Sequence, residues 1–440
     1  MPRNKHIGIV GGGILGMTLA LRLQESGFQV TILEATDGLG GILRPMQIGD
    51  YTWDRFYHVI LMSDSETLSL LNRLSLTQQI HWSRTRTGFL TDGQLHSMSN
   101  LMEFLTFPPL NLLEKIRLGL TIFYASRIKS PRGLERVPVS QWLEKLSGKR
   151  TFQKIWLPLL KSKLGENYKI TSASFIWATI SRMYAARRSG LKEEMFGYVE
   201  GGSATVLKKF QEVLNEAGVE VLCQSPVTGV GRHHNQARVA IPKGKIRDFD
   251  SVILTIPCNR IPEACPQLSE SEKERLKKVT YEGVVCAAFV LRKPLGGFYV
   301  TNLTDGKAPF TGVIEMTAVV DRVCFGGNSL VYLPRYAGHE DYIWKKGDDE
   351  ILGEFAGSLE KMYAGFREDD VVAGKIARAT EAFPVTTLNY STELLPRTQT
   401  SLENVFVVNS AQISNGTMNV NEIVGLANRK AVEIEKLISS

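Results

Sequence analysis

The stretch IGIVGGGILGMTLALRLQESGFQVTILEA, from Ile7 to Ala35, restricts the fold of this chain more than any other part of its 440 residues. A short apolar run leads into three glycines with the spacing Gly-x-Gly-x-x-Gly, and apolar residues interleaved with polar ones follow. A second apolar run then ends at Glu34. This order predicts a buried strand, a tight turn, a helix and a parallel strand, which is the βαβ unit of an α/β fold.

The glycines of this unit predict a dinucleotide-binding site of the Rossmann type. We expect Gly11 to make the tight turn, Gly13 to let the backbone approach a pyrophosphate, and Gly16 to let the helix pack closely on the strand. The helix would begin at Ile14 and Leu15, where free backbone N–H groups and the positive end of the helix dipole face the phosphates.

Glu34 stands at the tip of the second strand and is followed by Ala35. A carboxylate at this position accepts hydrogen bonds from the hydroxyls of an unphosphorylated ribose. Glycine-rich helix starts also occur in plain helix–strand packing, but strand, glycines, helix, strand and acid in register predict a bound dinucleotide.

A second glycine loop with Gly40-Gly41 follows the acid, and Arg44 is a candidate for a phosphate contact. With this loop the chain resembles the flavin-containing amine oxidase superfamily, which includes protoporphyrinogen oxidases, phytoene-type desaturases and monoamine oxidases. The resemblance implies FAD as the cofactor. The family usually has an Arg directly after the glycine pair, whereas Ile42 takes that place here.

Two later segments carry the same resemblance. In residues 198–230 it implies that the backbone of Val227 packs against the adenine. In residues 403–438 it implies a closing helix whose start faces the flavin at Met418, Asn419 and Val420. Ser410 stands where the family usually has an Asp that bonds the ribityl chain. Monoamine oxidases attach their flavin covalently to a Cys. No Cys follows Cys324 in this chain, so we expect a non-covalent flavin.

The predicted fold is therefore α/β, with a discontinuous Rossmann-like FAD/NAD(P)-binding domain over residues 1–60, 198–260 and 385–440. The substrate domain would comprise residues 61–197, a mostly helical and basic lobe, and residues 261–384, with an antiparallel sheet. Five Cys without a C-x-x-C pair suggest reduced thiols in a cytoplasm. We expect no metal, because no cluster has metal-ligand spacing.

The charge of the chain is unevenly distributed. Residues 111–192 contain 17 Lys and Arg against 4 Asp and Glu, whereas the whole chain has a net charge of +7. This asymmetry favours an anionic partner, either a phosphate-bearing substrate or an anionic membrane surface, such as the inner face of the cytoplasmic membrane. No nucleic-acid-binding motif is present. The stretch 112–129, with Lys115, Arg117, Arg127 and Lys129, reads equally well as an interfacial helix or as a core-facing helix with a basic outer face.

The candidates for chemistry lie mainly in DRFYHVI, residues 54–60, which the resemblance places along the flavin. His58 is a candidate proton carrier or a structural histidine, and Tyr57 lies beside it. Arg55 would pair with a substrate phosphate or with Asp54. Glu315 would be a base on a sheet strand or a solvent-facing side chain.

The resemblance implies an FAD-dependent oxidoreductase that acts by hydride transfer on a hydrophobic substrate of isoprenoid or tetrapyrrole type, with or without a phosphate. One alternative is a flavin mutase of a sugar nucleotide, similar to UDP-galactopyranose mutase, with arginines such as Arg182, Arg187 or Arg188 on the diphosphate. A second alternative is a prenyl-binding protein similar to GDP-dissociation inhibitors. The complete fingerprint argues against the second, because such proteins work without flavin catalysis.

Overall fold

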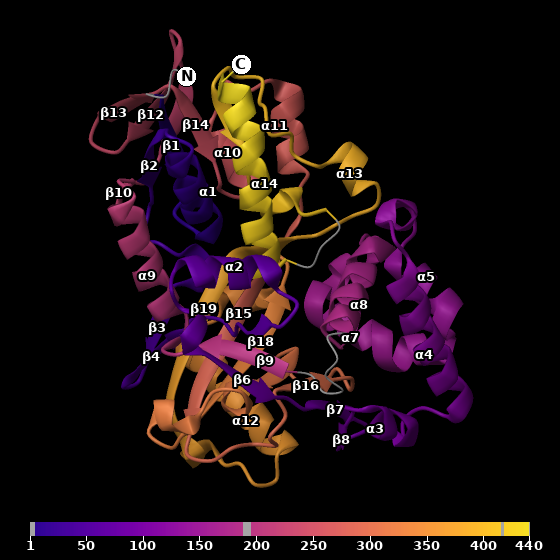
Figure 1. The fold of residues 1–440 in the computed structure, drawn as a ribbon. Helices are drawn as coiled ribbons and strands as arrows, with labels where there is room; N and C mark the ends of the chain where they lie inside the picture. Colours follow the sequence, from indigo (N-terminus) through magenta and orange to yellow (C-terminus); the bar gives the residue numbers. More distant parts are fainter. Residues whose placement is uncertain (1–4, 188–194, 415–417, 440) are drawn as a thin grey trace.

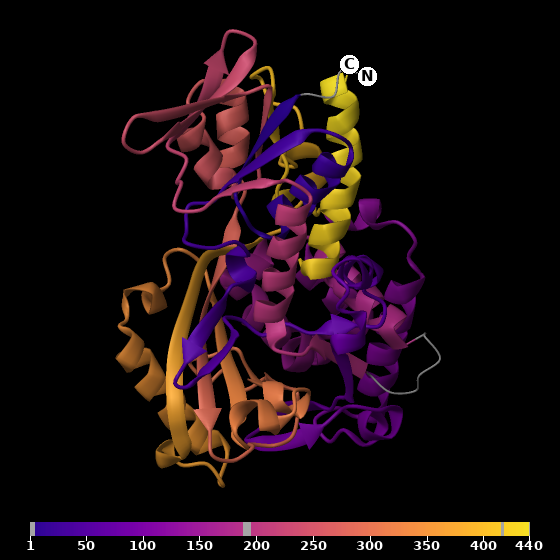
Figure 2. The same cartoon turned by 60° about the vertical axis from the view of Figure 1, so that its left-hand side comes forward.

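The computed structural model describes residues 5–187, 195–414 and 418–439. Figure 1 shows a small parallel sheet with α1 and α14 at the top, a large antiparallel sheet at the bottom and a lobe of helices at one side. Figure 2 shows the long strand β19 running the length of the large sheet.

The first sheet is the predicted Rossmann-like unit. β1 (His6–Val10), buried except at its first residue, pairs in parallel with β2 (Gln29–Leu33) and with β14 (Ser251–Leu254). β10 (Glu220–Leu222) and β20 (Val405–Val407) form the edges. α1 (Ile14–Glu25), α9 (Gly202–Glu216) and α14 (Val420–Ser439) share its apolar core. A three-stranded antiparallel sheet, β11 (Gly229–His233), β12 (Gln236–Ile241) and β13 (Lys245–Phe249), lies between β10 and β14 in the chain.

The second sheet has seven strands in the order β19, β15, β18, β17, β16, β7 and β8. β15 (Tyr281–Leu291), every residue of which is buried, lies between β18 (Ser329–Ala337) and the edge strand β19 (Val371–Pro384). β17 (Gly312–Glu315) and β16 (Val300–Leu303) continue the sheet, and α12 (Asp348–Met362) packs on β15 and β19. The predicted antiparallel substrate sheet is present, although β16 and β7 pair in parallel.

The structure differs from the sequence prediction at the start of the lobe. Residues 61–100 hold one helix, α2 (Ser65–Arg73), but also β6 (Ile80–Arg84), β7 (Thr87–Thr91) and β8 (Gln94–Ser97). β7 and β8 form a hairpin whose turn residues Asp92 and Gly93 both have positive φ. Asp-Gly favours this turn between short strands, and that local signal outweighs the helical surroundings.

The rest of the lobe is helical. It comprises α3 (Leu101–Thr106), α4 (Leu112–Arg127), α5 (Val139–Ser147), α7 (Leu157–Leu164) and α8 (Ala173–Arg187), which share one apolar core with Phe383 and Val385. Of the four basic residues expected on the outer side of α4 and just after it, Arg117, Arg127 and Lys129 are exposed, but Lys115 is not. Lys115 is buried, and its Nζ donates to the carbonyl oxygen of Leu105 over 2.7 Å. No helix in the described ranges is long and apolar enough to cross a membrane.

Two small antiparallel units join these regions. β3 (Pro45–Ile48) and β4 (Tyr51–Asp54) form a hairpin that leads from the glycine loops into residues 54–60. β9 (Met195–Val199) pairs with β6 and with the short β5 (Ile60–Leu61). The strands of the parallel sheet all come from the ranges predicted to bind FAD, and the division of the chain into domains stays a prediction.

The close packing at Gly16 generates a test of the βαβ unit. A Cβ at this position would lie 2.0 Å from the carbonyl oxygen of Gly11, so α1 would have to move away from β1. We expect Gly16→Ala to lower the free energy of unfolding by about 1–3 kcal/mol, as overpacking does. Gly353→Ala in α12 is the control, because an added Cβ there meets no atom within 4 Å. Equal melting temperatures of the two variants would contradict this packing.

Candidate functional site

The two glycine loops lie against each other at the carboxyl end of β1. The N–H of Gly40 donates to the carbonyl oxygen of Gly12 over 2.7 Å, and Gly13 and Gly40 form an isolated parallel bridge. Gly11 and Gly40 have φ values of 112° and 117°, which only glycine adopts without strain. A Cβ at Gly13 would meet no atom within 4 Å, so the backbone at Gly13 faces open space. This open cradle at the start of α1 fits a diphosphate. Ile14 and Leu15 are buried in the first turn of that helix.

Glu34 is nine-tenths buried behind this cradle. Its Oε2 accepts the N–H of Gly12 over 2.7 Å, and its Oε1 accepts the N–H and hydroxyl of Thr36 over 2.9 and 2.7 Å. A carboxylate accepts about four hydrogen bonds, two on each oxygen, so Oε2 keeps capacity for one more and fits a ribose hydroxyl. The neighbouring Ala35 is exposed.

The segment that carries Val227 runs beside this acid. The N–H of Ser225 donates to the carbonyl oxygen of Glu34, and the N–H of Gln224 to that of Thr36, both over 2.8 Å. The backbone near Val227 therefore lies where the adenosine end of the dinucleotide would be.

Arg44 forms an ion pair with Asp37 in the second glycine loop. Burial and the nearby Arg44 lower the pKa of Arg55, and Asp37 opposes them. The two guanidinium groups therefore lie near each other beside the glycine loops. Arg55 does not take Asp54 as its partner, because one Asp54 oxygen accepts the N–H of Ser203 and the other faces His58.

The closing segment contributes the start of α14. Asn409 is buried and bonds the carbonyl oxygen of Ile256 and the N–H of Ala411, so Ser410 opens a short turn beside it. Asn419 caps α14 by accepting the N–H of Glu422 over 3.0 Å. Met418 precedes this cap and Val420 begins the helix, and Met418 packs against the core of the helical lobe.

Residues 54–58 lead from β4 past this region. The carbonyl oxygen of Asp54 accepts the hydroxyl of Tyr332, which anchors the segment to β18. His58 Nδ1 is buried without a hydrogen-bond partner and lies 4.0 Å from an oxygen of Asp54. Burial lowers the pKa of His58 and raises that of Asp54, which favours neutral forms of both groups.

Tyr57 belongs to a polar chain that sequence reasoning missed. Its hydroxyl lies 2.9 Å from the hydroxyl of Tyr336, and Lys163 Nζ donates to Tyr336 over 2.6 Å. Burial lowers the pKa of Lys163 to about 8 and raises that of Tyr57 to about 12. All three side chains lie deep in the molecule yet keep part of their surface free. The one sequence signal was Lys163 itself, which follows the apolar run WLPLL in the stretch WLPLLKSKLGE.

Glu282 adds an acid near this chain. It is fully buried on β15, where its Oε2 accepts the side-chain amide of Asn167 over 2.6 Å and its Oε1 has no hydrogen-bond partner. Burial raises the pKa of Glu282 to about 7, and the charge of Lys163 opposes that rise. An acid and a base near neutrality therefore lie where the helical lobe meets the large sheet.

Glu315 is not available as a base. It is buried at the end of β17, and its two oxygens accept the N–H groups of Leu295, Gly296 and Gly297 over 3.0, 3.1 and 2.8 Å. The carboxylate holds that loop in place. Because alternation along a strand does not say which side of a sheet meets the site, the sequence could not separate these roles.

Most of the chain matches a known protein family. The family model of flavin containing amine oxidoreductases matches residues 16–420. The chain belongs to this family. The cradle at Gly13 and the acid at Glu34 fit FAD as the cofactor of this flavin-containing family.

The curated relatives match parts of the chain. Protoporphyrinogen oxidase 2 of Arabidopsis thaliana is 29% identical over 122 residues, 27% of this chain and 24% of that protein. Zeta-carotene desaturase of a Synechocystis strain is 23% identical over 239 residues, 49% of this chain and 48% of that one. The matches thus span half or less of these relatives.

Solved structures match over nearly the full length and show the fold. An oxidoreductase from Methanosarcina mazei has a TM-score of 0.75 at 15% identity, covering 97% of this chain and 100% of that one. A fatty acid isomerase from P. acnes has a TM-score of 0.73 at 13% identity, covering 98% and 99%.

The open cradle predicts the behaviour of one cofactor variant. Gly13→Val should fold, since a Cβ there meets no protein atom, but its side chain would fill the space that the pyrophosphate needs. We expect loss of FAD, measured as visible flavin absorbance per protein after gel filtration. Gly133→Val, another site where an added Cβ meets nothing within 4 Å, should stay yellow. Equal flavin content in both variants would rule out the cradle as the diphosphate site.

The contacts of Glu315 generate a second test. Glu315→Ala removes three backbone hydrogen bonds to a buried carboxylate, so the free energy of unfolding should fall by about 2–4 kcal/mol. Flavin reduction by substrate should keep its rate in the folded enzyme. The control is Glu216→Ala, at an exposed position on α9. A stable Glu315→Ala enzyme that no longer reduces its flavin would restore Glu315 as a base.

Proposed function

We propose that this enzyme removes hydride from a hydrophobic substrate bound beside Tyr57, His58 and Lys163. The observation that carries the proposal is the Lys163–Tyr336–Tyr57 chain, which lies at the meeting point of the segments expected around the flavin. Two large apolar clusters meet at Tyr336, one with Tyr57 and one with Met418 and Phe383. An apolar enclosure with few polar groups suits a large hydrophobic ligand.

The relatives support this substrate class. Their names record oxidation of protoporphyrinogen and desaturation of carotenoids, which are large and mainly apolar molecules. We infer a substrate of isoprenoid or tetrapyrrole type for this chain as well.

Tyr57, Tyr336 and Lys163 have a definite role in such a reaction. FAD, when bound, accepts the hydride. Removal of a hydride and a proton from the substrate requires a proton acceptor, and the Tyr57 hydroxyl is the end of the polar chain nearest His58. As Tyr57 takes up the substrate proton, it passes its own proton to Tyr336, which passes one to neutral Lys163. Burial keeps the pKa of Lys163 low enough for this role, although the nearby rings of Tyr336 and Phe383 would favour its charged form.

A phosphate on the substrate would require cationic side chains beside the substrate. The two neighbouring arginines, Arg44 and Arg55, lie beside the glycine loops, so they suit the diphosphate of the cofactor better than a group on the substrate. The mutase alternative requires arginines for a sugar nucleotide. Arg182 is held by both carboxylate oxygens of Asp64 at 3.0 Å, and the side chain of Arg187 and all of Arg188 lie outside the described residues.

Anaerobic flavin bleaching tests the substrate class. Prenyl, porphyrin, amine and UDP-sugar compounds would each be mixed with the oxidised enzyme, and flavin absorbance would be followed. We expect bleaching by a prenyl or porphyrin compound. A spectral shift with UDP-sugars alone, without bleaching, would favour the mutase instead.

We also propose that the enzyme works at an anionic membrane surface, on the inner face of the membrane. Substrates of this class dissolve in lipid, and the cationic lobe supports attraction to anionic lipids.

The pKa of Lys163 predicts the pH dependence of catalysis. Because Lys163 accepts a proton only when neutral, the rate of flavin reduction should rise with pH through an apparent pKa near 8. Lys163→Met should remove this step and slow reduction by about 10²–10⁴-fold, measured by stopped-flow absorbance. Lys161→Met, on the exposed side of the same helix, should keep the wild-type profile.

The same shift has a consequence for stability that does not depend on activity. Between pH 8 and pH 10.5 the unfolded chain binds more protons at Lys163 than the folded chain, so this group favours folding more as pH rises. Lys163→Met should therefore be more stable than wild type at pH 7, by up to about 3 kcal/mol, with the gain shrinking toward pH 10.5. A wild-type pH–rate profile in Lys163→Met would refute the proton relay.

A further inference from the structure

Helix α4 differs from an ordinary surface helix, because it buries Leu118 and Ala125 in the core of the lobe and is also apolar on its outward side. Its inward side carries the charged residues Glu114 and Lys115, both buried. Its outward side carries six large apolar residues that are 49–67% exposed: Leu112, Leu113, Ile116, Leu120, Phe123 and Tyr124. These positions recur at intervals of three and four, so they form one stripe along the helix.

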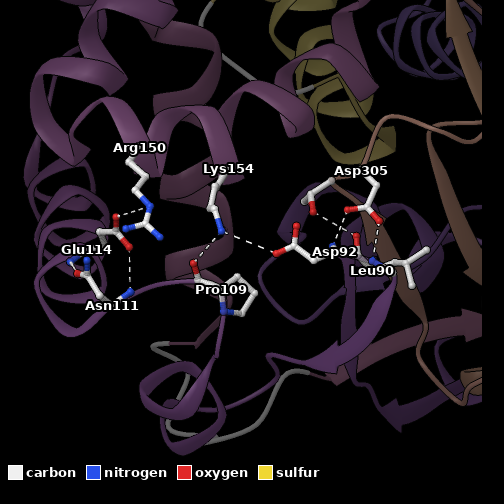
Figure 3. A network of polar contacts seen from close by, with 10 residues as sticks. Leu90, Asp92, Pro109, Asn111, Glu114, Arg150, Lys154 and Asp305 are labelled. Atoms are coloured by element: carbon white, nitrogen blue, oxygen red, sulfur yellow. Dashed lines mark hydrogen bonds and ion pairs between the residues drawn. The ribbon is translucent and has the colours of Figure 1, made fainter.

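The polar groups on the inward side are all engaged. Asn111 and Glu114 form a reciprocal capping box, and Arg150 pairs with Glu114 at 3.3 Å (Figure 3). Lys154 donates to the carbonyl oxygen of Pro109 over 3.4 Å and pairs with Asp92 of the β7–β8 hairpin at 3.8 Å. These contacts hold α4 and its preceding loop in the orientation that turns the leucines outward.

α3 extends the apolar surface. Leu101, Met102 and Leu105 are 70%, 69% and 45% exposed. The two helices are joined by the bond from Lys115 Nζ to the Leu105 carbonyl oxygen, and both lie at the outer edge of the molecule (Figure 1). We call the nine exposed apolar residues of α3 and α4 the apolar edge. Single exposed leucines are common, but nine on two adjoining helices exceed what a soluble surface usually shows.

Cations border the apolar edge. The Arg127 guanidinium lies 4.7 Å from the centre of the Phe123 ring, at the end of the stripe, and Lys129 follows in an exposed position. Arg117 is exposed one turn from Leu113 and Leu120. Large apolar side chains rimmed by arginine and lysine match the boundary between acyl chains and anionic headgroups. A neutral protein partner would not require this rim or the charge excess of the lobe.

We propose that the apolar edge docks the enzyme on an anionic lipid bilayer by inserting the stripe of α4 below the headgroups. The proposal rests on the proposed membrane association and names the surface responsible. On this surface, burial of apolar side chains contributes most of the free energy of membrane binding. Arg127 and Lys129 contribute a smaller part, which salt screens.

Vesicle flotation tests this assignment. Holoenzyme would be mixed with phosphatidylcholine vesicles that contain or lack phosphatidylglycerol, at low and physiological salt. We expect wild type to float with the anionic vesicles and to stay partly bound at physiological salt. Leu113→Asp/Leu120→Asp should bind at least about a hundredfold more weakly, because two buried leucines are lost. Arg127→Glu/Lys129→Glu should weaken binding less, by a factor of about 10–30, and reduce its salt dependence.

Val323→Asp is the matched control, because Val323 is 81% exposed on a turn outside the lobe. It should float like wild type. Flavin absorbance and melting temperature confirm that each variant is folded. A second measurement uses Leu120→Trp, whose added fluorescence should shift to the blue and be quenched by brominated lipids on binding.

The possible failures are distinguishable. Wild-type flotation in Leu113→Asp/Leu120→Asp, or an unquenched Trp at position 120, would overturn the proposal. A concentration-dependent dimer that this double variant abolishes, without flotation of wild type, would assign the apolar edge to a second copy of the chain instead. Flavin reduction by substrate in detergent is measured separately, so loss of vesicle binding with intact reduction would leave the proposed reaction standing.

Discussion

The contact between the two glycine loops determines the geometry of everything around the site. The hydrogen bond from Gly40 to Gly12 is possible only because neither loop has side chains in the way, and a Cβ at Gly41 would lie 3.2 Å from the Cα of Gly13. From this contact the chain enters the β3–β4 hairpin and then residues 54–58. Helix α9 contacts both ends of this path. Its Leu207 packs on Gly40, and the N–H of its Ser203 donates to Asp54. The position of His58 thus depends on the same backbone approach that forms the cradle.

The sequence predicted the parts of this arrangement that depend on local order. The βαβ unit is local: strand, glycines, helix and acid follow one another, and the structure confirms the fold they predict. The antiparallel sheet within residues 261–384 was also predicted, because its apolar runs are broken by turn residues. The β7–β8 hairpin was missed although Asp92-Gly93 marks its turn, because residues 61–197 were predicted to be mostly helical.

The polar chain at Lys163 could not be predicted, because its members are brought together by tertiary packing. Lys163 and Tyr336 are 173 residues apart, and Tyr57 and Tyr336 are 279 apart. Lys161 and Lys163 are two residues apart on one helix, yet one is exposed and the other reaches an aromatic enclosure. Charge counting treated them alike, and it likewise placed Lys115 at the surface. The sign and sum of charges in the lobe were visible in the sequence, whereas the direction of each side chain was not.

The order of strands in the parallel sheet has a consequence for how this chain becomes folded. β1 lies between β2, which follows within 30 residues, and β14, which begins at Ser251, while the edge strand β20 begins only at Val405. α14, which covers the apolar side of α1, comes later still. During synthesis at roughly 5–20 residues per second, the N-terminal unit therefore waits on the order of tens of seconds with that side uncovered. Such a topology leaves the apolar side of α1 exposed on the nascent chain until the last helix has emerged and can pack on it.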